Sequence, residues 1–293
     1  MAPLPPTGSN TARGILSMIV GGGALTTSDA ATKWLTETLP IGEILFVRAL
    51  VVSIAIGLIL WRSRSFGALR IGRYRNIAAR SVLAVVSTFL IVSSLARLPL
   101  NEVIAILFVG PLFVAILATP LLGERVGIHR WLAVLIGFTG MLIMVRPGTA
   151  GFQVAALLPV VAALVAATRD IVTRRISTAE TSVAILFYSM IALTLVGLAT
   201  APFGWLPMDA GDIALLILTG LLFGLGHYFI IEGYRYAEAT VVAPYRYANL
   251  IWAALLGFVL WGEIPSIWVL AGTPLVVGSG LYILLYERSR RRL

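Results

Sequence analysis

Ten long apolar stretches follow one another along this chain of 293 residues, and the loops that join them are too short to hold a soluble domain. They cover residues 14–36, 41–61, 77–97, 99–121, 128–146, 152–173, 181–201, 212–233, 238–261 and 265–286. A helix needs about 20 apolar residues to cross the hydrocarbon core of a bilayer. Charged residues make up 12% of the chain, against roughly 25% in soluble domains. The sequence therefore predicts an all-α, polytopic membrane protein with ten transmembrane helices.

The uneven placement of lysine and arginine predicts the orientation in the membrane. If the N-terminus is cytoplasmic, sixteen of the 22 basic residues lie on that side, and Lys33, Arg97 and Arg146 lie on the other. The sixteen include Arg80, counted with the cytoplasmic segment before the third span. Because short loops rich in lysine and arginine stay in the cytoplasm, we expect both termini there and the protein in the cytoplasmic (inner) membrane. The same loops explain the formal charge of +9, so we expect no nucleic-acid partner.

The two halves of the chain share a pattern of residues. Residues 25–48 match residues 166–189 through a common Thr-x-Asp-x-x-Thr-[Lys/Arg] segment, which begins at Thr27 and at Thr168. Further along, Gly123-Glu124 matches Gly262-Glu263. A unit with an odd number of spans places its second copy upside down, and such inverted repeats are typical of secondary transporters with a substrate site near the midplane. We expect a cytoplasmic tail (1–13), two inverted five-helix repeats (14–148 and 152–286) and a basic cytoplasmic tail (287–293).

Each half also closes on similar residues. In the first half these are Pro111-Leu112-Phe113, Leu122 to Arg125 and a span with Gly137 and Gly140; in the second they are Pro244, Trp252 to Gly257, Trp261-Gly262-Glu263 and a glycine-rich last span. In these features the chain resembles the EamA domain family of the drug/metabolite transporter superfamily over nearly its whole length. The resemblance implies a secondary transporter, with export of amino acids, aromatic ones included, as the first expectation. Uptake or exchange of a nucleoside-like metabolite, or drug efflux, is the alternative.

Two ionisable residues in the first two spans are expected to pair. A charged group inside a span costs roughly 2.5–3.5 kcal/mol on insertion scales, so it needs a partner or a function. The first hairpin turns near Leu39, which places Asp29 and Arg48 at nearly equal depth. Their pair is either a gate or clamp for a substrate carboxylate, or a structural ion pair between the two spans.

The second half holds the remaining intramembrane charges. Arg169 and Asp170 occupy the matching region of the sixth span, and Arg246 lies at a similar depth in the ninth. This predicts an Asp170–Arg246 pair. Arg169 is then left to contact a substrate or a backbone carbonyl, or to extend toward the cytoplasmic surface as a structural residue.

Further candidates for a substrate site lie on three spans. His227, beside Tyr228, is either a proton relay, because its ordinary pKa lies near physiological pH, or a hydrogen-bonded packing residue. Tyr245, Asn249 and Trp252 share one helical face, which either lines a cavity that binds a planar solute or packs against other helices. Tyr188 in the seventh span is a weaker candidate.

Glycine and proline predict where helices approach or bend. Gly21 to Gly23 form either a packing face or a flexible, broken part of the first span, while Gly220 and Gly224, and Gly278 and Gly280, allow close helix contacts. Prolines interrupt four spans and allow bending, at positions Pro111, Pro159, Pro244 and Pro274.

The sequence argues against several other functions. It has no P-loop, so a proton gradient, exchange or the gradient of the solute itself has to drive transport. The chain has no cysteine and only two histidines, which leaves no basis for a metal site or a cofactor. An intramembrane enzyme lacks converging catalytic groups, and a channel usually needs oligomeric rings, whereas two repeats suffice for a transporter that works as a monomer. We therefore expect a small-molecule substrate and the lipid bilayer as partners.

Overall fold

The computed structural model describes residues 8–72, 74–110, 112–114, 116–117, 128–149, 152–176, 180–236 and 243–290, and in these ranges it is helical without any strand. The first repeat contributes α1 (Gly8–Leu35), α2 (Ile41–Arg62), α3 (Tyr74–Leu95), α4 (Leu100–Leu107) and α6 (Ile128–Val145). The second contributes α7 (Leu157–Ile176), α8 (Ser182–Leu198), α9 (Ala210–Tyr236), α11 (Ala248–Trp261) and α12 (Ile267–Arg290). Short 3-10 turns are η1 (Phe66–Leu69), η2 (Val154–Ala156), η3 (Ala201–Phe203) and η4 (Ala243–Tyr247).

The helices follow the apolar stretches of the sequence, so the all-α prediction is confirmed. Five of them are by themselves long and apolar enough to cross a membrane, namely those within Ile41–Arg62, Tyr74–Leu95, Val154–Thr173, Val183–Phe203 and Ala210–Ile230. Shorter apolar helices lie at Leu100–Val114, Trp131–Val145 and Ile267–Ile283. The end of the fourth expected span and the start of the ninth lie outside the described residues.

Two expectations about breaks in the helices are wrong. α1 runs without interruption from Gly8 to Leu35, through the three consecutive glycines that were a candidate break. Pro159 does not interrupt a helix, because it lies in the first turn of α7, where its missing N–H group has no helical partner to lose. Pro274 does lie inside α12, whereas Pro111 falls outside the described residues.

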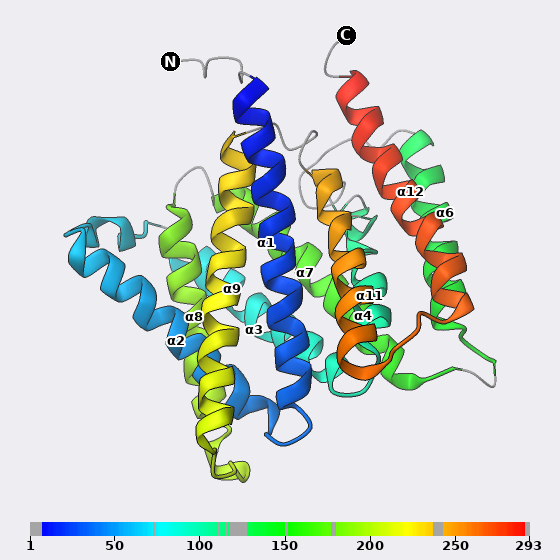
Figure 1. Cartoon of the computed structure of the whole chain (residues 1–293). Coiled ribbons are helices and arrows are strands. Elements are labelled where there is room, and N and C mark those ends of the chain that lie inside the picture. The colour runs from blue at the N-terminus through cyan, green and yellow to red at the C-terminus, as the bar shows by residue number, and fades with distance from the viewer. Residues whose placement is uncertain are drawn as a thin grey trace.

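The main helix contacts stay the same when each helix is replaced by its counterpart in the other repeat, as expected for two inverted repeats (Figure 1). α1 packs on α9, and its counterpart α7 packs on α3; likewise α2 packs on α9, and α8 on α3. α1 contacts α11, and α7 contacts α4. The pairs α2–α8, α4–α11 and α6–α12 each join two equivalent helices. A two-fold axis in the membrane plane produces this pattern, and α1 accordingly begins at the end of the bundle where α12 ends.

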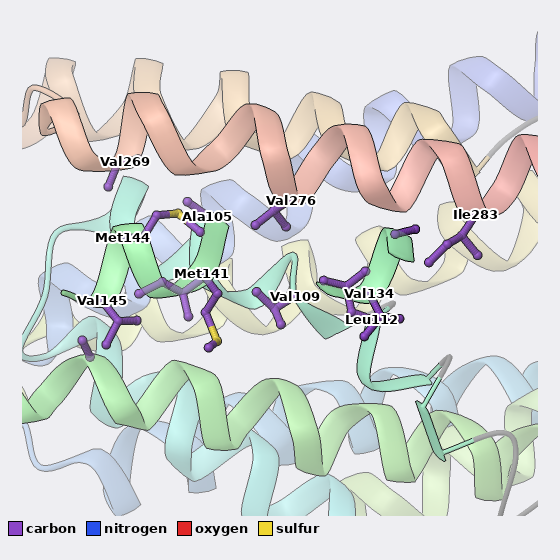
Figure 2. Packing of buried hydrophobic residues seen from close by; sticks show 13 residues of the cluster. Ala105, Val109, Leu112, Val134, Met141, Met144, Val145, Val269, Val276 and Ile283 are labelled. Carbon is purple, nitrogen blue, oxygen red and sulfur yellow. The ribbon is translucent and has the colours of Figure 1, made fainter. Parts of the chain in front are cut away.

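The buried apolar side chains form several clusters, and the larger ones join helices of both repeats. Figure 2 shows the largest cluster, where Val109 and Leu112 lie near Val134 of α6 and Val276 of α12. Large apolar side chains also cover the outside, among them Ile59, Leu135, Ile251 and Val259, each more than half exposed. Such a surface is unsuited to water and is suited to lipid chains.

Glycine allows the closest helix contacts. A Cβ added at Gly140 of α6 would lie 2.7 Å from the carbonyl oxygen of Gly272 on α12, and one at Gly226 of α9 would lie 3.0 Å from that of Gly21 on α1. The expectation for Gly278 is wrong, because nothing lies within 4 Å of a Cβ built there. The three glycines of α1 therefore serve as a packing face.

Candidate functional site

The ion pair expected between the first two spans is present. Arg48 of α2 has a side chain only 3% exposed, and its Nη2 lies 3.8 Å from Oδ1 of Asp29 on α1. Its Nη1 donates a hydrogen bond of 3.1 Å to Oγ1 of Thr32, one turn further along α1. The ring of Phe223 on α9 covers the guanidinium at 3.9 Å. We call Asp29, Thr32 and Arg48 the first half-site.

An arginine also bonds the second copy of the motif, but it comes from the other repeat. Thr173 of α7, the counterpart of Thr32, accepts a hydrogen bond of 3.3 Å from Nε of Arg80 on α3. Nη1 of Arg80 donates to the carbonyl oxygen of Ile185 at 3.2 Å and to Oγ of Ser189, both on α8. We call Arg80, Arg169, Asp170, Thr173 and Ser189 the second half-site. Arg80 belongs to this site rather than to the cytoplasmic segment in which the sequence placed it.

The partners of Arg169 differ from those expected. Its Nε and Nη2 donate to Oδ1 of the neighbouring Asp170 at 3.1 and 3.0 Å, and its Nη1 lies 3.4 Å from Oγ of Ser87 on α3. The guanidinium thus bridges α7 to α3, neither bonding a carbonyl nor extending away from the bundle. The Asp170–Arg246 pair stays a prediction.

Water reaches the second half-site. The side chain of Asp170 is 50% exposed and that of Arg169 is 25% exposed, although both lie about six residues, or roughly 9 Å, inside α7. A carboxylate exposed to lipid at such depth is too costly, so charged groups there face the bundle interior or a water-filled space. The first half-site, by contrast, holds its arginine away from solvent.

His227 contacts the same aromatic ring that covers Arg48. Its Nδ1 is 3.0 Å from the carbonyl oxygen of Phe223, and its ring stacks on that of Phe223 at 4.3 Å. Since a carbonyl can only accept, Nδ1 carries the proton and Nε2 is left as an acceptor. Arg48, Arg80 and Arg169 are all within electrostatic range of this ring. The histidine therefore packs by a hydrogen bond, as one of the two interpretations expected, and its role in proton transfer stays a hypothesis.

Asn249 and Trp252 of the ninth span pack against α1, which is one of the two interpretations expected. A Cβ added at Gly23 would lie 3.2 Å from the Trp252 ring, and one at Gly22 would collide with the Asn249 amide. Oδ1 of Asn249 is buried and has no hydrogen-bond partner among the residues that the structure describes. The expected regular helical face begins only at Ala248, because η4 is a 3-10 turn; Tyr245 and Arg246 are exposed on that turn.

Two other tyrosines from the sequence analysis lie away from these contacts. The Tyr188 hydroxyl donates to the carbonyl oxygen of Leu69 at 3.2 Å and so fastens the loop between α2 and α3. Thr181 bonds the same loop at Ala68, over 2.6 Å. Tyr228 is 56% exposed and lies edge-on to Phe229. Neither tyrosine joins a half-site in this conformation.

A compact set of polar contacts closes the end of the bundle opposite the start of α1. Glu263 pairs with Lys33 of α1 at 3.0 Å, and its Oε2 accepts the Leu100 N–H at the start of α4, over 2.8 Å. Gly262, with φ +66°, ends α11 and turns the following glutamate toward α4. Trp261 donates to Glu37 at 3.0 Å. Glu263 thus caps the start of α4, while Gly123 and Glu124 lie outside the described residues.

A metal or cofactor finds little support in this arrangement. The carboxylates of Asp29 and Asp170 are each bound by an arginine. The two half-sites offer guanidinium donors and hydroxyls instead, which bind anionic and polar oxygen atoms.

Comparison with known sequences matches this architecture to one family. The profile of the EamA-like transporter family matches residues 12–146 and again residues 153–285. The chain belongs to the EamA-like transporter family. It is accordingly a ten-span membrane protein built from two repeats, and a transporter rather than an enzyme.

Several members of the EamA family resemble the chain over most of its length. It is 31% identical to a riboflavin transporter of Rhizobium johnstonii over 283 residues, 95% of this chain and 93% of the relative. Identity is 29% over 191 residues with an S-adenosylmethionine uptake transporter of Rickettsia prowazekii, 65% of each chain. A pseudopaline exporter of Pseudomonas aeruginosa is 26% identical over 269 residues, 90% of this chain and 93% of that one.

A solved structure shares the fold of this EamA-family chain. A crystal structure superposes with a TM-score of 0.63 over 96% of this chain and 98% of the other. Sequence identity between the two is 19%, so this likeness bears on the fold alone.

Sequence reasoning missed the residues of α3 and α8 in the second half-site. Arg80 follows a run of loop arginines and was assigned to them, although it lies six residues inside α3. Ser87 and Ser189 are small polar residues with no distinguishing pattern. The repeat offered a usable signal, since Ser189 is the counterpart of Arg48 and Thr173 that of Thr32.

Proposed function

We propose that this EamA-family chain is a secondary transporter that moves a small polar organic metabolite across the cytoplasmic membrane by alternating access. The observation that carries the proposal is the pair of inverted half-sites, each with a guanidinium held by a threonine of the repeated motif. In inverted-repeat transporters the solute binds between the halves, and the repeats exchange roles as access alternates.

The two ends of the bundle differ in a way that supports this mechanism. Glu263, Lys33 and Leu100 hold α11, α1 and α4 together at one end, which the arginine distribution places outside. Asp170, toward the other end, is half exposed. We propose that the solute reaches the half-sites from the cytoplasm in this conformation, and that the contacts of Glu263 break when the site turns outward.

An amino acid exported from the cell is our first substrate candidate, because a guanidinium binds a carboxylate well. A nucleoside-like or flavin-like metabolite is the second candidate. It is favoured by the riboflavin and S-adenosylmethionine transporters among the relatives, and by the Phe223 ring, which stacks with both Arg48 and His227. The relatives include both an uptake protein and an exporter, so the direction of transport across the membrane is itself part of the proposal.

We propose a proton gradient or exchange as the energy source. His227 has its Nδ1 engaged by Phe223, so its Nε2 is the atom available to take up a proton. In a proton-coupled transporter, uptake into liposomes follows an imposed pH gradient, and in an exchanger it follows solute loaded on the opposite side. A His227→Gln variant that keeps full proton-driven transport would remove His227 from this role.

The test is transport by purified protein in liposomes. Labelled aromatic amino acids, riboflavin and S-adenosylmethionine are offered separately, first to the protein and then to empty liposomes. We expect saturable uptake of at least one of them, and loss of uptake in Arg246→Ala with the melting temperature retained. Arg97→Ala, at an exposed arginine of the opposite end, is the matched control and transports normally. Absence of uptake for every solute in the panel contradicts the proposal.

A further inference from the structure

The two half-sites are built on the same motif but differ in charge. In the first, the carboxylate of Asp29 balances the guanidinium of Arg48 at 3.8 Å. In the second, Asp170 is bound by Arg169, and Arg80 adds a further positive charge. Ser28 in the first copy corresponds to Arg169 in the second, and Arg48 corresponds to Ser189, while Arg80 is supplied by α3 of the other repeat.

The charge of Arg80 is only partly balanced, because Asp170 attracts it from a distance and Arg169 repels it. Its Nε and Nη1 donate to a threonine hydroxyl, a serine hydroxyl and a backbone carbonyl, all of them uncharged. In the described part of the chain no carboxylate oxygen lies within 4.0 Å of its guanidinium nitrogens. Neutral oxygens solvate the guanidinium but leave its charge in place, which is costly inside a span.

The arrangement leaves donors for a ligand. Within the described residues the hydrogen bonds of Arg80 use Nε and Nη1, and none uses the two N–H groups of Nη2. Arg169 comes from the facing helix, close enough that its charge repels that of Arg80. Arg80 of α3 donates to Thr173 of α7, and Arg169 of α7 donates to Ser87 of α3. The two guanidinium groups therefore lie along one contact between α3 and α7, which we call the seam. Water reaches this seam beside Asp170.

We infer that the second half-site binds an anionic group of the transported solute, with Arg80 and Arg169 as its donors. This inference rests on the proposed function and names the class of substrate: an organic anion whose carboxylate or phosphate oxygens replace water at the seam. Two arginines that converge on one space suit the oxygens of either group. The first half-site has no net charge. It therefore binds either an uncharged part of the solute or no part of it.

A purely structural role for the same residues makes a different prediction. Arg80 ties α3 to α7 and α8, so removing it weakens the bundle whether or not it binds a ligand. Arg169 offers a cleaner test, because its side chain is 25% exposed and the other repeat carries serine at this position. A structural role alone changes stability without changing the preference between charged and neutral ligands.

The experiment compares two pairs of probes that differ in one charged group. L-tryptophan is paired with L-tryptophanamide, and riboflavin 5′-phosphate with riboflavin. Binding to the purified full chain in detergent is measured by titration calorimetry and by the shift in melting temperature. We expect the member of at least one pair that carries the carboxylate or phosphate to bind about tenfold or more tightly than the partner that lacks this group, a difference of roughly 1.4 kcal/mol. Which pair responds distinguishes carboxylate from phosphate.

The variants test the assignment to these residues. Arg169→Ser should abolish the preference for the anion while the protein stays folded, and Arg80→Lys should reduce it, because a lysine keeps the charge without the second pair of donors. Arg97→Ser makes the same charge change at an exposed position and should leave the preference unaltered. Equal binding of both members of each pair by the unmodified protein overturns the inference, as does an undiminished preference in Arg169→Ser.

Failure of this inference is distinguishable from failure of the proposed function. A chain that transports riboflavin and its phosphate, or tryptophan and its amide, at equal rates keeps the proposed function and overturns the anion site. A chain that binds the anions through Arg169 but transports no member of the panel keeps the anion site and contradicts the function. Absence of binding by all four probes counts against the anion site.

Discussion

The side chain of Arg48 is buried to 3% exposure, and its charge depends on Asp29 for balance. Removing one partner of a buried ion pair leaves an unpaired charge and costs about 3–5 kcal/mol. We therefore expect Asp29→Asn to lower the free energy of unfolding by this amount, measured by thermal denaturation in detergent with tryptophan fluorescence.

A double variant separates stability from transport. Asp29→Asn combined with Arg48→Met removes both charges and replaces the arginine by an apolar side chain of similar length, so it should recover most of the lost stability. If the pair is only structural, this variant transports like the original chain; if the pair is a gate or clamp, transport stays absent although the fold is restored. An Asp29→Asn protein as stable as the original contradicts the assignment of the ion pair.

At the scale of single residues, depth in the membrane was predictable and tertiary partners were not. Asp29 and Arg48 flank one hairpin, so counting residues from Leu39 placed them at one level and predicted their contact. Arg80 and Thr173 come from different repeats, and no count along the chain relates them. The face of Asn249 and Trp252 follows from helical periodicity, but its packing on Gly22 and Gly23 depends on which helices are neighbours. The position of a residue on its own helix follows from the nearby sequence, whereas the choice of neighbouring helices depends on the whole bundle.

Among the elements, α4 depends on a residue from the other repeat. Pro99 at its N-cap provides no side-chain hydrogen bond, and Glu263 supplies one to Leu100 while pairing with Lys33. Glu263→Gln keeps an oxygen for the Leu100 N–H but loses the ion pair, and Glu263→Ala loses both. Since a lost helix cap costs about 0.5–2 kcal/mol, we expect the melting temperature to fall in the order original, Gln, Ala. An alanine variant that melts no lower than the glutamine variant contradicts the capping role.

The pairing of α6 with α12 depends on two facing glycines. A Cβ at Gly140 would lie 2.7 Å from the Gly272 carbonyl oxygen, so Gly140→Ala forces the two backbones apart. Overpacking of this kind costs about 1–3 kcal/mol, which should appear as a lower melting temperature. Gly278→Ala is the matched control on the same helix pair, because its Cβ meets nothing within 4 Å. Equal effects of the two substitutions would show that helix propensity, and not the close approach, decides the outcome.

Across the whole molecule, the inverted repeat explains why one motif appears at two depths. The motif ends α1 near one face of the bundle and ends α7 near the opposite face, because the second copy is turned over. Each copy positions a threonine about one turn, and an aspartate about two turns, from the end of its helix. The two half-sites thus lie toward opposite ends of the bundle.

Orientation is testable because the chain contains no cysteine, so an introduced cysteine is its only thiol. Phe66 lies in the loop expected in the cytoplasm and is 54% exposed, while Phe203 lies in a loop expected outside and is 87% exposed. In intact cells a membrane-impermeant maleimide should label Phe203→Cys at once, and Phe66→Cys only after permeabilisation. The reverse pattern contradicts the orientation inferred from the arginines.

Opening of the outer end is testable with the same reagent. Leu98 is 2% exposed, and its carbonyl oxygen accepts a hydrogen bond of 2.6 Å from Lys33, so Leu98→Cys should label slowly while that end is closed. Adding Glu263→Ala removes the contact that holds α11 to α4 and should raise the labelling rate, because the closed state loses stabilisation that the open state never had. Phe203→Cys, exposed throughout, should label at the same rate in both backgrounds. If Glu263→Ala leaves the labelling of Leu98→Cys unchanged, these contacts do not govern access, and closure has to depend on the apolar packing beneath them.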